Sequence, residues 1–181
     1  MMEEELELSS SQSSIKEILV AAVALEEMME EFYMRLGDVS SKHGTLFQRF
    51  SLEERRHAEL LLELVGKVGK AKLTLNRSSM EHVENIMDSS KRVVEELSKA
   101  LGSLRYGEEV RLETLLLVML HAEESAVEFY QALYRAVKPE CGELLEGILE
   151  EEFRHLENAR RVYRALHGVY AQTAGSASNA N

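Results

Sequence analysis

Cysteine, proline and tryptophan are almost missing from this chain, and each gap restricts what the protein can be. The 181 residues include one cysteine, Cys141, one proline, Pro139, and no tryptophan. A single cysteine rules out an internal disulfide framework and a four-cysteine iron or zinc site within the chain. Because proline breaks helices and the sequence is rich in Glu, Leu, Ala and Arg, we expect an all-α protein. The length fits one domain with a sizeable core.

Positive charge and long apolar runs are also scarce. Lys and Arg number 21 against 32 Asp and Glu, which gives a formal net charge of -11. This balance argues against nucleic acid and anionic membrane surfaces as partners and favours cations as ligands. The longest strongly apolar run, 115–120, is far too short to span a bilayer, and the acidic residues 1–14 do not resemble a secretory signal. We expect a soluble, cytoplasmic protein with no nucleic acid and no membrane partner.

The apolar pattern and the glycines predict four main helices arranged as two hairpins. Helices are expected over residues 15–36, 45–66, 108–137 and 141–167. Gly37 is expected to end the first helix and Gly168 the last. Two hairpins joined by one long connection, here residues 67–107, define a ferritin-like four-helix bundle. We predict this bundle over residues 14–168.

The connection and the two chain ends have patterns of their own. Residues 79–101 have the apolar spacing of a further helix inside the crossover. The sequence leaves open whether that helix lies across the bundle or is exchanged with a partner chain. Residues 1–13 are polar, so we expect a flexible N-terminal segment. Residues 169–181 end in small polar residues and are expected to form a disordered tail.

One pattern of charged residues occurs twice along the chain. Segments 26–33 and 123–130 both read Glu-Glu-x-x-x-Glu-Phe-Tyr, at an offset of 97 residues. About one helix further on, each is followed by Glu-x-x-His, first at Glu54 and then at Glu152, at an offset of 98. One Glu plus one Glu-x-x-His per hairpin is the pattern with which a four-helix bundle holds two metal ions in its core.

These charged residues stand where apolar residues are expected. In the first helix, Ala22, Met29 and Tyr33 lie on the buried stripe, and the steps of three and four require a core residue at Glu26. The other three helices show the same interruption of the stripe near mid-length. The interrupting residues are Glu54 and His57, then Glu123, then Glu152 and His155.

Four buried carboxylates facing one another would be very costly without compensating charge. Two metal ions supply that charge, and the Glu-x-x-His spacing places both side chains on one helix face, where they can share a metal. Mixed carboxylate and imidazole ligands suit iron or manganese better than calcium, and zinc tolerates the same ligands. The sequence therefore predicts a two-metal centre, with catalysis through the metals. Its six ligands are Glu26, Glu54, His57, Glu123, Glu152 and His155.

Neighbouring residues leave two questions open. Glu124 is the main rival of Glu123 as a ligand, although the apolar stripe and the match to Glu26 favour Glu123. Tyr33 and Tyr130 each follow a single Glu ligand by two helical turns on the same face. Each tyrosine is either an ordinary core residue or a residue that hydrogen-bonds to a ligand carboxylate and orients it.

At these residues the chain resembles the rubrerythrin and ferritin-like di-iron carboxylate superfamily. The resemblance covers both hairpins, about 15–66 and 108–167. It implies a cofactor of two iron ions, with Glu54 and Glu152 as bridging ligands and the two histidines as terminal nitrogen donors. It also implies that reduced iron reacts with hydrogen peroxide or oxygen. Oxidative stress is the matching physiological setting, and a homodimer is the expected assembly.

The chain departs from the family pattern in three ways. Rubrerythrins have an additional Glu three residues from the third-helix ligand, but Leu120 and Ala126 stand at those positions here. Bacterioferritins bind haem through a Met at the position of Arg55. The four cysteines of a rubredoxin-like domain are missing, so electrons must come from an external donor such as rubredoxin.

Three functions are consistent with these features. The leading hypothesis is a rubrerythrin-like oxidoreductase that reduces hydrogen peroxide or oxygen. The first alternative is an iron-binding and storage protein with ferroxidase activity but no peroxide turnover. The second alternative is a metal-free helical interaction module, in which the carboxylates are displaced from the core.

Overall fold

The described part of the chain is entirely helical in its regular structure. The computed structural model describes the backbone of residues 2–40, 42–68, 77–136 and 142–177, and the side chains of 15–40, 42–68, 81–136 and 142–165. The helices are α1 (Met2–Val39), α2 (Gly44–Val68), α3 (Arg77–Arg105), α4 (Leu112–Ala136) and α5 (Gly142–Ala177). The all-α class predicted from composition is thereby confirmed.

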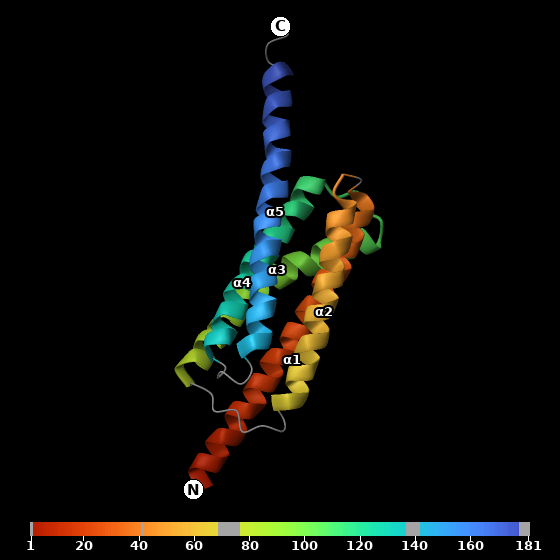
Figure 1. Cartoon of the computed structure of the whole chain (residues 1–181). Helices are drawn as coiled ribbons and strands as arrows, with labels where there is room; N and C mark the ends of the chain where they lie inside the picture. Colours follow the sequence, from red (N-terminus) through yellow and green to blue (C-terminus); the bar gives the residue numbers. More distant parts are fainter. Residues whose placement is uncertain (1, 41, 69–76, 137–141, 178–181) are drawn as a thin grey trace.

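The helices form a ferritin-like bundle of two hairpins with a helical crossover. α1 pairs with α2, α4 pairs with α5, and α3 connects the hairpins while packing on α4 and α1 of the same chain (Figure 1). Along α3, Val83 joins one hydrophobic cluster and Leu97 and Leu101 join another. The crossover is therefore a fifth helix that runs along the bundle. None of the described helices is long and apolar enough to cross a membrane.

The helix ends differ from those predicted from glycine positions. α1 begins at Met2 instead of near residue 15 and continues past Gly37 to Val39, and α5 continues past Gly168 to Ala177. A lone glycine in a helix costs only about 1 kcal/mol relative to alanine, and neither helix contains a proline. Glycine alone therefore does not stop these helices. Pro139 and Cys141 lie outside the described residues.

Glycine does have a structural role in both described interhelical turns. Between α1 and α2, a Cβ on Gly44 would lie 3.0 Å from the carbonyl oxygen of Gly37, so the close approach of the two backbones depends on glycine. After α3, Gly107 has a φ of 68°. The amide of Glu108 donates to the carbonyl of Ser103 at 2.9 Å, and that of Gly107 to Leu104 at 3.3 Å. This is a Schellman termination, which requires the left-handed residue.

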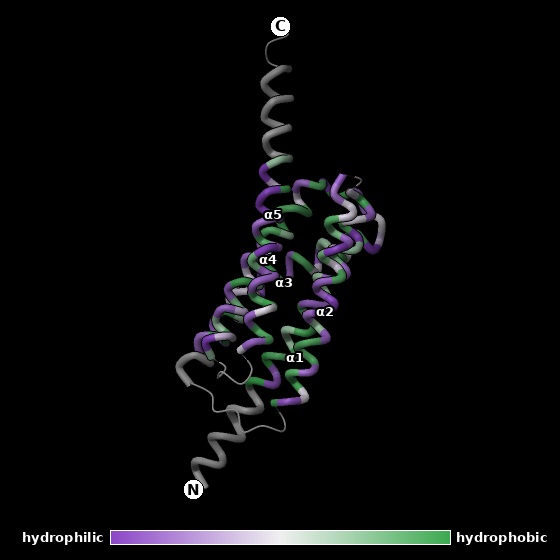
Figure 2. The backbone as a smooth tube through the Cα atoms, in the orientation of Figure 1, coloured by the Kyte–Doolittle hydropathy of each residue, from purple (hydrophilic) through white to green (hydrophobic). Residues whose placement is uncertain are grey.

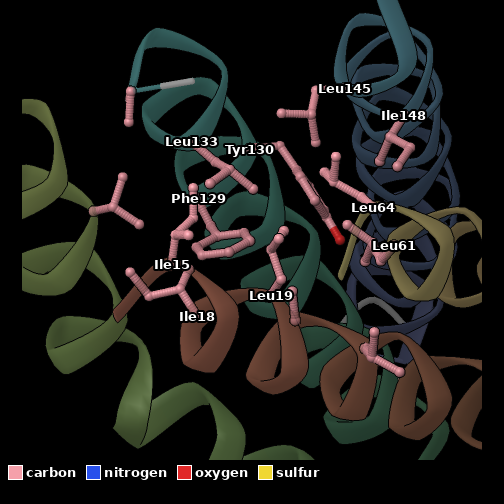
Figure 3. Packing of buried hydrophobic residues seen from close by; sticks show 14 of the residues in the cluster. Ile15, Ile18, Leu19, Leu61, Leu64, Phe129, Tyr130, Leu133, Leu145 and Ile148 are labelled. Carbon is pink, nitrogen blue, oxygen red and sulfur yellow. The ribbon is translucent and has the colours of Figure 1, made fainter. Parts of the chain in front are cut away.

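The core consists of two hydrophobic clusters. Hydrophobic and hydrophilic residues alternate along the bundle helices that enclose them (Figure 2). The first cluster includes Leu19, Leu61 and Leu133, with Tyr130 standing among the leucines (Figure 3). The second includes Phe32, Phe47 and other residues from the opposite half of each helix. In each of α1, α2, α4 and α5, the stretch between its two sets of cluster residues contains the buried charged residues. A polar layer therefore separates the two halves of the core.

Candidate metal centre

The polar layer consists of the six residues that the apolar stripes single out. Their exposed fractions are all 2 % or less. α1 and α4 contribute one carboxylate each, and α2 and α5 contribute one Glu-x-x-His each: Glu26, Glu123, Glu54 with His57, and Glu152 with His155. Each residue lies near the middle of its helix, where the backbone amides and carbonyls are already paired, so only the side chains need partners. The helices thus position the donors without using any loop.

The Nδ1 atom of each histidine faces a group of carboxylate oxygens. His57 Nδ1 lies 2.8 Å from Glu152 Oε1, 3.3 Å from Glu54 Oε2 and 3.6 Å from Glu26 Oε2. His155 Nδ1 lies 3.0 Å from Glu54 Oε1 and 4.0 Å from both Glu123 Oε2 and Glu152 Oε2. The two imidazole centroids are 5.9 Å apart. All six side chains therefore converge on one small volume.

Two sets of donors within this volume could each hold a metal ion. In one set, atoms of Glu26, Glu54, His57 and Glu152 all lie within 4.8 Å of one another. In the other set, the same holds for Glu54, Glu123 and His155. Glu54 is the residue common to both sets and could contribute an oxygen to each. Glu152, the second bridging residue implied by the family resemblance, belongs only to the first.

Buried atoms without hydrogen-bond partners test whether a metal pair fits. Within the described residues, each of the six side chains has one buried oxygen or nitrogen atom that makes no hydrogen bond. These atoms are Glu26 Oε2, Glu54 Oε1, His57 Nδ1, Glu123 Oε2, Glu152 Oε1 and His155 Nδ1. Leaving such atoms unpaired costs about 1–3 kcal/mol each, and more for charged groups. Four carboxylate oxygens and two imidazole nitrogens form a donor set that suits iron or manganese, so the residues fit the group.

The electrostatics of the polar layer show the same need for compensating positive charge. Burial, reinforced by the neighbouring Glu54, raises the pKa of Glu26 well above its usual value, and burial likewise raises the pKa of Glu123. Burial alone would lower the pKa of His155, but Glu53 and Glu54 raise it to about 11. The site therefore retains protons that a metal pair would displace.

Both tyrosines singled out by the sequence reach into the polar layer from opposite sides. The Tyr33 hydroxyl donates a hydrogen bond to Glu123 Oε1, and the Tyr130 hydroxyl donates to Glu26 Oε1. Each tyrosine thus crosses between α1 and α4, and its ring packs in a different hydrophobic cluster. One oxygen of each single Glu accepts a tyrosine hydroxyl, and the other oxygen is buried without a hydrogen-bond partner.

Glu53 and Glu151 belong to the site, although the sequence analysis did not single them out. Glu53 Oε2 lies 2.8 Å from His155 Nε2, and Glu151 Oε2 lies 3.0 Å from His57 Nε2. A signal was available in the sequence, because both Glu-x-x-His motifs extend to Glu-Glu-x-Arg-His. The additional Glu falls next to the buried stripe, where a solvated residue is the usual interpretation.

The rival ligand and the departures from the family pattern lie elsewhere. Glu124 is half-buried and accepts a hydrogen bond from Arg160 at 2.9 Å, so it is engaged on the outer side of α4, whereas Glu123 is fully buried. Ala126 is buried, and Leu120 packs against the second hydrophobic cluster. Neither residue supplies a seventh donor. Arg55 is exposed and paired with Glu30, away from the core.

The comparison with protein families agrees with this site. The rubrerythrin family model matches residues 17–113, which is 97 of the 181 residues. The chain belongs to the rubrerythrin family. The matched region includes the donors of α1 and α2, while those of α4 and α5 lie beyond it and are supported by the internal repeat and by the geometry. No curated protein and no solved structure matches the chain significantly.

Proposed function

We propose that this member of the rubrerythrin family is a di-iron oxidoreductase that reduces hydrogen peroxide or oxygen. The observation that carries the proposal is the set of six buried atoms, one on each predicted ligand, that lack hydrogen-bond partners and face a common volume. A reduced iron pair bound there would supply the two electrons that convert hydrogen peroxide, with two protons, into two waters. Manganese or zinc could occupy the same ligands, so the metal identity belongs to the proposal.

The residues of the chain would perform three tasks in this reaction. The four carboxylates would balance the metal charge, and Glu54 would bridge because it alone belongs to both donor sets. Tyr33 and Tyr130 would hold the single carboxylates in place through their hydroxyl groups. The two hydrophobic clusters on either side would keep bulk water away from the reactive centre.

The electron donor is proposed to be a separate protein such as rubredoxin. The chain has a single cysteine, so its own residues cannot form the four-cysteine iron site of a rubredoxin-like donor. A homodimer is the proposed assembly, and its mass in solution would separate it from the large cage expected of a storage protein.

Metal analysis followed by a peroxide assay tests this function. Protein from iron-replete cells should contain about two iron ions per chain. After anaerobic reduction, the loaded protein should consume hydrogen peroxide repeatedly when a reductant is supplied, whereas a storage protein would oxidise its iron without sustained turnover. Glu54→Ala should lose both peroxide consumption and iron oxidation, because it removes the ligand that the two donor sets share. Glu63→Ala, an exposed position on the same helix, serves as the matched control. Equal peroxide rates in wild type and Glu54→Ala would rule out the proposal.

A further inference from the structure

We propose that Glu53 and Glu151 are positioning residues, each of which holds the candidate ligand histidine of the opposite hairpin. The inference rests on the proposed metal-binding function of the six buried residues. The two hydrogen bonds cross between helices: His57 of α2 meets Glu151 of α5 at 3.0 Å, and His155 of α5 meets Glu53 of α2 at 2.8 Å. Each Glu-Glu-x-Arg-His motif is therefore completed by the other copy.

The geometry of these bonds shows which imidazole nitrogen faces the centre. Glu53 contacts Arg49 and Arg154 as well as His155, and a carboxylate paired with guanidinium groups can only accept hydrogen bonds. Glu151 likewise contacts Arg56 and Arg154 as well as His57. Each histidine therefore donates from Nε2, on the outer side. Nδ1 is the nitrogen that faces the carboxylate oxygens. A metal ion that displaced the Nδ1 proton would find a lone pair directed at it, while the ring stays held through Nε2.

The two carboxylates are themselves held by arginines at the surface. Arg49 Nε donates to Glu53 Oε1 at 3.0 Å, and Arg56 donates to Glu151. Arg154 lies within 3.9 Å of Glu53 and 3.6 Å of Glu151. The glutamates are 16 % and 18 % exposed, whereas the three arginines are 43–60 % exposed. The two carboxylates thus lie between the buried imidazoles and the surface guanidinium groups. Contacts on both sides restrict the rotation of the carboxylates.

The crossing also joins two helices that are otherwise only lightly packed together. α2 packs closely on α1 and α5 on α4, whereas the direct contact between α2 and α5 is small. The hydrogen bonds of Glu53 and Glu151 are direct links between these two helices. A purely structural role would therefore be a reasonable rival, in which both residues stabilise the seam but leave the metal ligands unaffected.

Cobalt binding separates the two roles. Co²⁺ is titrated into metal-free full-length protein, with chelator competition to measure affinity and visible absorption to report the ligand field. Glu53→Ala and Glu151→Ala should each weaken Co²⁺ binding by about 10- to 100-fold and alter the visible bands. Glu63→Ala and Glu150→Ala, at exposed positions on the same helices, should bind as wild type does. Glu53→Gln and Glu151→Gln, which preserve size and an accepting oxygen, should fall between wild type and the alanine variants.

Double-mutant cycles test the crossing itself. In a His155→Ala background, Glu53→Ala should weaken binding of the remaining Co²⁺ much less than it does in wild type, because its target is gone. In a His57→Ala background, the Glu53→Ala loss should persist in full. Glu151 should show the reverse pattern. A merely structural role predicts the same loss in both backgrounds, and a local effect predicts coupling of Glu53 to His57 of its own helix.

Each outcome decides between these roles. If the Glu53 and Glu151 variants bind Co²⁺ as tightly as the Glu63 and Glu150 controls, the positioning role is overturned. Coupling of either glutamate to the histidine of its own helix would also overturn it. If an alanine variant has lost helical circular dichroism, the glutamine variant carries the same comparison. If the wild type binds no Co²⁺, the proposed function fails. If the wild type binds and only the crossed coupling is missing, the positioning role alone fails.

Discussion

His57 and His155 occupy matching positions in the repeat but have different surroundings. The Phe50 ring lies 4.4 Å from His155 between centroids, and the corresponding residue in the other copy is Ile148. His57 has three carboxylate oxygens within 3.6 Å of Nδ1, whereas His155 has one at 3.0 Å and two at 4.0 Å. The repeat therefore preserves the donors but not their spacing, and the two halves of the centre are unequal.

Unequal donor sets predict stepwise metal loading. The set around His57 offers four donors and the set around His155 three, so the first metal ion should bind at least about tenfold more tightly, or 1.4 kcal/mol. Titration calorimetry with Mn²⁺ should resolve two steps. His57→Ala should remove the tighter step and His155→Ala the weaker one. A single class of sites in the wild type would contradict this prediction.

Removing either tyrosine hydroxyl should destabilise the protein. Tyr33→Phe leaves a buried oxygen of Glu123 without its donor, and Tyr130→Phe does the same for Glu26, at a cost of about 1–3 kcal/mol. Urea unfolding of the metal-free proteins would measure this loss. Tyr134→Phe, where the tyrosine is 38 % exposed, should change the free energy of unfolding very little. Similar changes in all three variants would mean that the hydroxyl bonds contribute nothing specific.

At the scale of helices, the sequence predicts which face of each helix is buried better than it predicts where the helix begins and ends. The spacing of apolar residues located the buried face of each bundle helix, and Glu26, Glu54 and Glu123 could be assigned to the core because they interrupt it. Helix ends depend on small differences, such as the modest cost of Gly168 within α5, that tertiary context easily outweighs. The partners of Glu53 and Glu151 could not be predicted either, because a crossed contact requires knowledge of how α2 and α5 face each other.

The end of α3 is fixed to α1 by a salt bridge whose contribution depends on pH. Arg105 Nε donates to Glu31 at 2.8 Å, and Arg105 and Arg35 lower the pKa of Glu31 to about 2 from an ordinary value of 4.5. A carboxylate with a lowered pKa stabilises the fold above its unfolded pKa and loses that contribution as pH falls towards the folded pKa. The stabilisation should therefore be present at pH 7 and disappear between about pH 5 and pH 2.

Arg105→Ala tests this contribution. Because Arg105 is 54 % exposed, solvent screens the pair, and the variant should lose only a small part of the unfolding free energy at pH 7. The difference from wild type should shrink as the pH is lowered towards 2 in chemical denaturation experiments. Arg92→Ala removes an arginine that pairs only within α3 among its described contacts, so it controls for the loss of charge. A difference that stays constant with pH would exclude Glu31 as its source.

At the scale of the whole molecule, metal binding should join the two hairpins and stabilise the fold. The donors come from α1 and α2 on one side and from α4 and α5 on the other, and their carboxylates are closely spaced. A metal that binds only the folded state adds about 2.7 kcal/mol when its free concentration is a hundredfold above its dissociation constant. The melting temperature should therefore rise with metal concentration and fall with a chelator. A melting temperature that does not respond to either would contradict the prediction.

The crossed contacts define the smallest unit that could work. An isolated α1–α2 hairpin would keep three of the six donors but would lose the described contacts with the other hairpin. Glu26 would lose the hydroxyl of Tyr130. Tyr33 and Glu53 would lose Glu123 and His155, the residues to which they hydrogen-bond. Two identical hairpins associated face to face would satisfy every one of these contacts reciprocally. The repeat of 97 to 98 residues thus gives one chain the approximate symmetry of a dimer of hairpins, with α3 as the connection between its two halves.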